Sequence, residues 1–180
     1  VIFDSTNSHF VKRMINRGSS IFEYNTRPPE IWIGIKVIVI FLQKIFSHDF
    51  KENIRHQKGR IYGLFKYFRN VYIESMLISI NPKYVITLID NNELFGWLSK
   101  NCKEILFIAI QNGGRLSYAA SNISSYHCQH LFCFGMHEIN LFPKIGYQVD
   151  NFYPVGSLVS SLYFNNDLNN NQEKYDLLIV

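Results

Sequence analysis

Two short apolar segments, each followed at once by a polar cluster, constrain the fold of this chain more than any other feature. Residues 84–89 (YVITLI) run into Asp90-Asn91-Asn92, and residues 105–110 (ILFIAI) run into Gln111-Asn112-Gly113-Gly114-Arg115. Segments that are apolar at nearly every position are typical of strands buried on both faces, as in a parallel sheet covered by helices on both sides. The sequence therefore predicts an α/β fold with an open, mostly parallel sheet.

Four other segments fit strands of the same sheet, and helical patterns separate them. Apolar runs that end at small or polar residues occur near 1–4, 21–24, 131–134 and 152–155. The sequence between them predicts helices over 9–16, 31–46, 71–80, 136–142 and 158–164. Alternation of helix and strand is the repeating unit of an open parallel sheet, so we expect about six strands with helices on both faces.

The length and composition indicate one folded unit followed by the start of another. With 180 residues, of which 47% are hydrophobic and 18% charged, the chain is long enough to bury a core. A polar, asparagine-rich stretch at 165–174 precedes the apolar run YDLLIV at 175–180. We expect an α/β domain over 1–164, a linker over 165–174 and the first strand of a second domain at 175–180. The last segment would also fit as an extra strand of the first sheet.

Residues 31–46 are apolar enough to suggest a membrane segment. They contain two lysines, Lys36 and Lys44, and their 16 residues fall short of the ~20 that are needed to span the hydrocarbon core of a bilayer. We therefore expect a buried helix here.

Basic residues are concentrated between residues 36 and 69. Eight lysines and arginines but only two acidic residues lie there, so this segment carries a formal charge of +6, while the whole chain carries +4. A total this small does not indicate a nucleic-acid partner. Residues 62–69 interleave aromatic and basic side chains, which fits either a helix whose aromatic rings pack inward or a surface that contacts anionic lipids.

The three cysteines fit a reducing compartment, and no disulfide is expected. His127, Cys128, His130, Cys133 and His137 stand at spacings that invite a zinc interpretation. However, Cys133 falls within an expected buried strand, where neighbouring side chains face opposite ways. Buried free cysteines are the favoured interpretation.

Polar clusters at the carboxyl ends of the expected strands form the candidate functional site. In open parallel sheets, ligands bind at this edge. Carboxylate and amide groups suit sugar hydroxyls, and a carboxylate such as Asp90 can serve as the catalytic base for an acceptor hydroxyl. Each cluster also fits an ordinary polar turn. The candidate substrate-binding residues are Asp4, Asn7, Asn91, Asn92, Gln111, Asn112, Gly113, Gly114, Arg115, Gly156 and Ser157.

The order of these motifs resembles a known family. The chain has ITLIDNN at 86–92, IAIQNGGR at 108–115, LFCFG at 131–135 and FYPVGS at 152–157. This series is similar to bacterial surface-carbohydrate biosynthesis proteins of the GT-B glycosyltransferase type. Those proteins have two Rossmann-like domains with a cleft between them. The resemblance implies that this chain is the acceptor-side, N-terminal domain, and that it lacks most of the donor-binding domain.

The resemblance also implies a function in O-antigen, lipopolysaccharide or capsule synthesis. The full-length protein would transfer a sugar from a nucleotide-activated donor to a saccharide or lipid-linked acceptor, whereas this chain alone would bind no cofactor and be inactive. We expect a cytoplasmic protein at the inner membrane face, with peripheral contact to anionic lipids through residues 36–69. The alternatives are a non-hydrolysing sugar-nucleotide epimerase of the same architecture and a non-catalytic sugar-binding or scaffold module.

Overall fold

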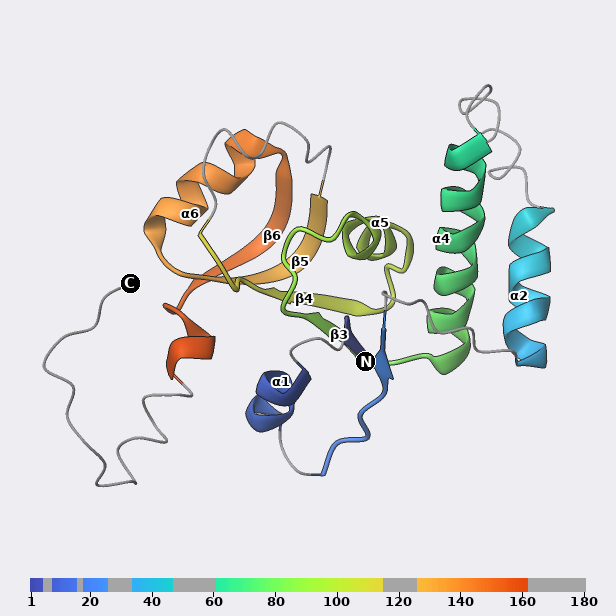
Figure 1. The fold of residues 1–180 in the computed structure, drawn as a ribbon, viewed down its shortest axis with the longest axis horizontal. Coiled ribbons are helices and arrows are strands. Elements are labelled where there is room, and N and C mark those ends of the chain that lie inside the picture. Colours follow the sequence, from blue (N-terminus) through green and yellow to red (C-terminus); the bar gives the residue numbers. More distant parts are fainter. Residues whose placement is uncertain (5–7, 16–17, 26–33, 47–60, 115–125, 162–180) are drawn as a thin grey trace, which may run out of the picture.

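The computed structural model describes residues 1–4, 8–15, 18–25, 34–46, 61–114 and 126–161, which form one α/β unit (Figure 1). Its sheet has six strands, all parallel, in the order β2-β1-β3-β4-β5-β6. The strands are β1 (Ile2–Phe3), β2 (Glu23–Tyr24), β3 (Tyr84–Thr87), β4 (Leu106–Ile110), β5 (Tyr126–Cys133) and β6 (Tyr147–Pro154). The predicted Rossmann-like fold class is confirmed.

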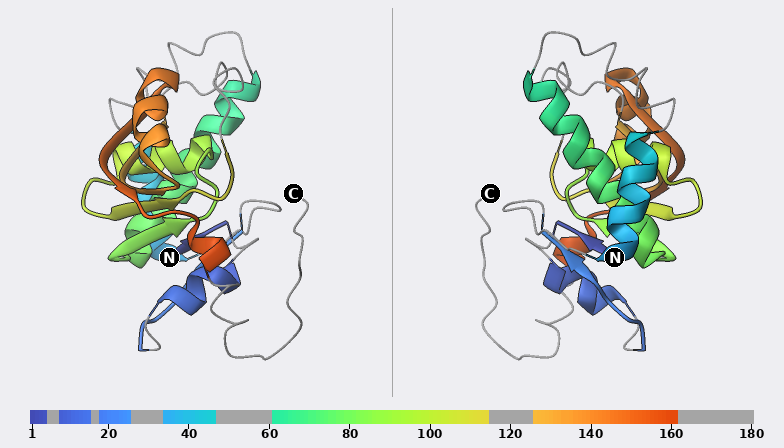
Figure 2. Two further views of the ribbon diagram at one scale, coloured as in Figure 1. Left: turned by 90° about the vertical axis from the view of Figure 1, so that its left-hand side faces the viewer. Right: turned by 90° about the vertical axis from the view of Figure 1, so that its right-hand side faces the viewer.

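Helices cover both faces of this sheet (Figure 2). The helices with both ends among the described residues are α1 (Ser8–Met14), α2 (Ile35–Ile45), α4 (Ile61–Ile80), α5 (Glu93–Asn101), α6 (Met136–Leu141) and the 3-10 helix η3 (Phe142–Ile145). Residues 158–161 are also helical. The larger core cluster joins strand residues such as Val85 and Phe107 to Leu77 of α4 and Phe95 of α5. The smaller cluster, on the other face, joins Ile2, Leu88 and Ile110 to Phe10 and Val11 of α1. The sheet is therefore buried on both sides, as its continuous apolar runs predict.

The predicted strand positions are confirmed, but β5 and β6 begin earlier than expected. Strand β5 was predicted over 131–134 and starts at Tyr126, and β6 was predicted over 152–155 and starts at Tyr147. The early part of β5 contains half-buried polar side chains, including His127 and Gln129. Strand β6 is an edge strand with mostly exposed or half-buried residues. The first residues of β5 and β6 are partly polar, so the apolar pattern that predicts a strand is missing there, although the backbones pair.

Helices α2 and α4 form a pair at one end of the sheet (Figure 1). Lys44 of α2 pairs with Glu74 of α4 at 2.7 Å, and the Lys36 ammonium donates to the carbonyl of Ser79 at 3.3 Å. The ring of Phe41 meets that of Tyr72 edge to face, with centroids 6.1 Å apart. Helix α4 is also longer than the predicted 71–80, since it begins at residue 61.

The helical prediction for residues 31–46 is confirmed over 35–45, but the prediction that this helix is buried is wrong. Only Val37 of α2 is buried, because the helix packs mainly along α4 and not across the sheet. Its outer side presents an apolar stripe at helical spacing, formed by Ile35, Ile38, Val39, Leu42 and Phe46. Within the described ranges, no helix combines the length and the apolar character that a membrane crossing requires.

The predicted linker over 165–174 and the predicted strand at 175–180 lie outside the described residues. Both therefore stay predictions, as does the end of the first domain at residue 164.

Candidate functional site

The strand order reverses beside β1, which makes the carboxyl edge above β1 and β3 the crevice where ligands bind in sheets of this kind. Strand β1 pairs with β2 on one side and with β3 on the other, so the connections leave in opposite directions. Asp4 follows β1 directly, and Asp90 comes three residues after the end of β3. Two of the predicted site residues are thus brought to adjacent strand ends.

Both of these aspartates are buried, with relative exposures of 7% for Asp4 and 0% for Asp90. The backbone of Asp4 has φ 66°, in the left-handed region that aspartate tolerates better than most residues. Its N–H donates to the carbonyl of Tyr24 at 2.8 Å, so the turn after β1 is fixed by β2. Because Asp90 exposes no surface, its predicted role as a base requires the loop after β3 to open toward a ligand.

Asn92 and Gln111 use their side chains within the protein. The Asn92 side-chain oxygen accepts hydrogen bonds from the N–H groups of Leu94 at 2.9 Å and Phe95 at 3.3 Å, which makes Asn92 the N-cap of α5. The Gln111 amide donates to the carbonyl of Gly113 at 2.9 Å, and its oxygen accepts from the N–H of Phe134 at 3.0 Å. Gln111 therefore ties the end of β4 to the end of β5.

The remaining predicted site residues have different surroundings. Asn91, Asn112 and Gly114 are exposed and Gly113 is half-buried, whereas Asn7 and Arg115 lie outside the described residues.

After β6 the chain turns back at Gly156, which has φ 79°. The predicted cap is confirmed, because the Ser157 hydroxyl oxygen accepts from the N–H of Ser160 at 3.1 Å. Leu158 and Val159 then pack against the cluster that contains Phe10.

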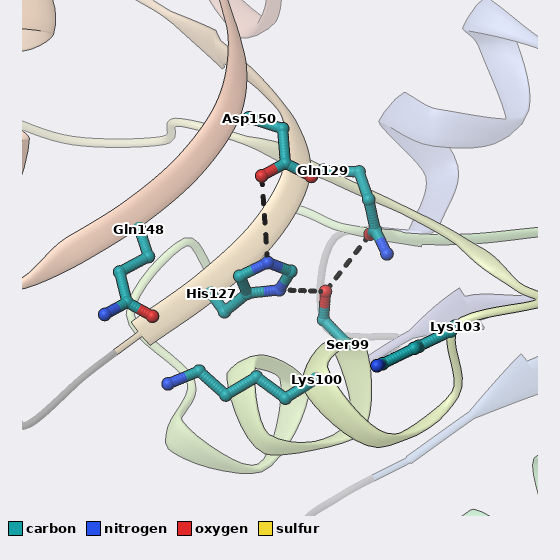
Figure 3. Close-up of a pocket in the computed structure, with 7 residues that line it drawn as sticks. All are labelled: Ser99, Lys100, Lys103, His127, Gln129, Gln148 and Asp150. Atoms are coloured by element: carbon teal, nitrogen blue, oxygen red, sulfur yellow. Dashed lines mark hydrogen bonds and ion pairs between the residues drawn. The ribbon is translucent and has the colours of Figure 1, made fainter.

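A pocket that the sequence did not predict lies at the opposite, amino edge of the sheet (Figure 3). It has a volume of about 630 Å³ and lies among the last turn of α5, the loop after it and the first residues of β5 and β6. The parallel register of β5 and β6, in which His127 pairs with Gln148, brings two polar strand starts together here. The lining residues are Ser99, Lys100, Lys103, His127, Gln129, Gln148 and Asp150.

A chain of polar contacts runs through one wall of this pocket (Figure 3). Nδ1 of His127 lies 2.9 Å from the hydroxyl oxygen of Ser99, which also lies 3.1 Å from the side-chain oxygen of Gln129. That oxygen accepts from the N–H of Phe107 at 3.0 Å. On its other side, His127 presents Nε2 at 3.9 Å from a carboxylate oxygen of Asp150.

The pKa of His127 is lowered from its ordinary value. Burial of the ring is the main cause, because it penalises the charged form. The nearby Asp150 carboxylate raises this pKa, and the Lys100 ammonium lowers it. The ring is therefore held toward its neutral form beside an open pocket.

The cysteines behave as buried thiols. Cys102, Cys128 and Cys133 are all free and buried, as predicted. Burial raises the pKa of Cys102 to about 12, and it also raises the pKa of Cys128. Neutral thiols bind zinc poorly. Among the residues that the structure describes, no group of three or more histidines, cysteines and carboxylates is placed to hold a metal ion.

The amino-edge pocket is hard to predict from the sequence, because Ser99, His127 and Asp150 are far apart in the chain and belong to three different elements. One signal was present: the polar residues His127 and Gln129 alternate with Tyr126 and Cys128, which is typical of a strand with one buried face.

No protein-family model, curated protein or solved structure matches this chain.

Proposed function

We propose that this chain is the acceptor-side unit of a glycosyltransferase of surface polysaccharide synthesis, and that a sugar acceptor binds above β1 and β3. The observation that carries this proposal is the placement of two buried carboxylates, Asp4 and Asp90, after neighbouring strands at the point where the strand order reverses. Ligands of open parallel sheets bind at such points. The donor would be a nucleotide sugar held largely by a second domain.

The chemistry of this edge suits a sugar. Ionised carboxylates accept hydrogen bonds from hydroxyl groups, and the exposed amides of Asn91 and Asn112 both donate and accept. A carboxylate in a buried site costs free energy, and such groups occur preferentially at functional sites. Asp90 is the candidate base, and Asn92 and Gln111 hold the surrounding turns in place.

The apolar stripe of α2 supports a location at a membrane surface, where a lipid-linked acceptor would be presented. We propose that the basic segment 36–69 contacts anionic lipid head groups while the stripe enters the interface. Lys44 and Lys66 are paired with Glu74 and Glu93, so the other lysines and arginines of the segment would make this contact. This contact is peripheral and is independent of the sugar site.

Titration of the 180-residue chain with saccharides, followed by backbone amide NMR signals, tests the binding site. We expect shifts at Asp4 and at residues 88–92 and 112–114. These shifts should be lost in Asp4→Asn and Asp90→Asn and kept in Asp150→Asn, which alters a carboxylate at the opposite edge. Shifts that survive both carboxyl-edge substitutions, or no response to any saccharide, would contradict the proposal.

Labelled nucleotide sugars supplied to the full-length protein test the reaction. Transfer to a saccharide or lipid-linked acceptor supports the transferase. Isomerisation of the donor would identify an epimerase, and neither reaction would leave a sugar-binding module. Asp90→Asn should lower turnover by roughly 10²–10⁴-fold if Asp90 is the general base.

A further inference from the structure

We propose that the amino-edge pocket is a second binding site, which takes a phosphorylated polyol such as a sugar phosphate. In this site Nε2 of His127 accepts a hydrogen bond from a ligand hydroxyl, and the positive charges of Lys100 and Lys103 attract the phosphate group. This inference does not depend on the carboxyl edge, which lies at the other end of the strands.

The hydrogen bonds around Ser99 determine which nitrogen of His127 carries the proton. The backbone N–H of Phe107 donates to one atom of the Gln129 amide, so that atom is the oxygen and not the nitrogen. That oxygen can only accept, so the Ser99 hydroxyl donates its single hydrogen to it across 3.1 Å. The Ser99 oxygen must then accept from Nδ1–H of His127 at 2.9 Å. The neutral ring therefore presents the lone pair of Nε2 to the pocket.

This direction rules out a nucleophilic serine, although Ser99, His127 and Asp150 are the residue types of a catalytic triad. A triad histidine accepts the proton of its serine. Here the serine proton is given to Gln129, and Ser99 is 1% exposed, so no substrate reaches its oxygen. Ser99 is a positioning residue, which fixes the tautomer of His127.

Nε2 has no carboxylate within hydrogen-bond distance. Asp150 lies 3.9 Å away, which is too long for a hydrogen bond, and its side chain is 57% exposed. Two neighbouring ligand hydroxyls fit this arrangement, because one can donate to Nε2 and the other to the Asp150 carboxylate. A vicinal diol of a polyol or sugar supplies such a pair.

The charges that line the pocket determine where an anion binds. Lys100 and Lys103 contribute two positive charges, Asp150 contributes one negative charge and His127 is held toward the neutral form. The net charge is positive, and Figure 3 shows both ammonium groups away from Asp150, that of Lys100 toward Gln148 and that of Lys103 on the side of Ser99. A phosphate is therefore attracted to the two lysines, while the hydroxyls of the same molecule lie toward β5 and β6. Gln148 offers an amide on the β6 side.

Nitrogen NMR of the histidine rings in the 180-residue chain tests the tautomer. At pH 7.5 we expect the proton of His127 on Nδ1 and the unprotonated, pyridine-like nitrogen at Nε2. Ser99→Ala removes the acceptor of Nδ1–H and should produce a mixture of tautomers. A proton on Nε2 in the parent chain would overturn the proposed direction of the hydrogen bonds.

Titration with glycerol 3-phosphate, ribose 5-phosphate and glucose 6-phosphate tests the ligand class. Glucose, which has the hydroxyl groups alone, and inorganic phosphate are the control ligands. We expect at least one sugar or polyol phosphate to shift the ring signals of His127 and the amides of Lys100 and Gln148. Lys100→Gln with Lys103→Gln should weaken binding by about tenfold, since one exposed ion pair changes affinity by about two- to fivefold. Lys144→Gln, at an exposed lysine of η3, should bind as the parent does.

Three results would overturn the proposal. One is the absence of any response to the three phosphorylated compounds. Another is an equal response of Lys100 to inorganic phosphate with no change at His127, which would indicate an adventitious ion only. The third is unchanged binding in the double lysine variant.

Discussion

Gly96 of α5 lies so close to His127 of β5 that a Cβ atom built on the glycine would lie 3.0 Å from the backbone nitrogen of His127. The same atom would lie 3.1 Å from the ring of Tyr126 and 3.3 Å from its Cα. Two of these three neighbours are backbone atoms, which cannot move aside without shifting the strand. The glycine thus sets the distance between α5 and β5, and with it the width of the amino-edge pocket.

We expect Gly96→Ala to destabilise the fold. Overpacking costs about 1–3 kcal/mol, and the better helix propensity of alanine returns up to about 1 kcal/mol. A net loss measured by urea unfolding would agree with this balance. Gly114→Ala is the matched control, because nothing lies within 4 Å of a Cβ at that exposed position. Equal stability of the two variants would contradict the close packing.

Asn92→Ala should lower the free energy of unfolding by about 1 kcal/mol, because it removes the cap of α5. Asn92→Ser and Asn92→Asp keep an acceptor oxygen at the N-cap and should retain most of the stability. Asn91→Ala alters the exposed neighbour and serves as the control. If Asn92→Ala lost sugar binding while retaining full stability, the residue would be a ligand contact and not a cap.

The stability of the chain should fall as the pH drops below about 6.5, the ordinary pKa of histidine in an unfolded chain. The pKa of His127 is lowered in the folded chain, mainly by burial, so the unfolded chain binds the proton first. The contribution of His127 to the free energy of unfolding is therefore complete above the pKa of the histidine in the unfolded chain. It is lost as the pH falls toward the pKa of His127 in the folded chain. Between pH 7.5 and 5, the free energy of unfolding should change less with pH for His127→Gln than for the parent. The exposed His137→Gln on α6 should follow the parent, and the same slope in all three chains would refute the assignment to His127.

Binding to vesicles that contain anionic lipid should depend on both salt and the apolar stripe of α2. The double variant Ile38→Glu/Leu42→Glu should bind at least about a hundredfold more weakly, because burial of each of the two side chains is worth about 1.5–3 kcal/mol and every 1.4 kcal/mol corresponds to about a tenfold change in affinity. Met136→Glu adds a charge at an exposed apolar residue of α6 and should bind much as the parent does. Co-sedimentation at low and high salt measures both effects. Binding that persists unchanged in high salt, or in the double variant, would exclude the proposed surface.

The sheet could be predicted because its central strands are continuous apolar runs, as at 84–89 and 105–110. Burial of α2 was mispredicted because apolar composition does not reveal which neighbour covers a helix, and among the described elements α2 packs mainly along α4. The polar residues at the carboxyl edge could be predicted because each cluster directly follows an apolar run in the sequence. The amino-edge pocket could not be predicted, since its geometry arises from the register of β5 with β6 and from the close approach of Gly96.

The pairing of β1 with β3 has a consequence for the order in which the sheet opens. Ile2 pairs with Ile86 across most of the N-terminal half of the chain, whereas the pairs from β3 to β6 join strands that are near neighbours in sequence. Closing the longer loop costs more conformational entropy, so β1 should detach first in local unfolding. The amide of Ile86, which donates to Val1, should then exchange with solvent faster than that of Gln111, which donates to Phe132. Such transient detachment exposes the edge of β3 and would open a path for a ligand to the Asp90 carboxylate, which is fully buried in the closed sheet.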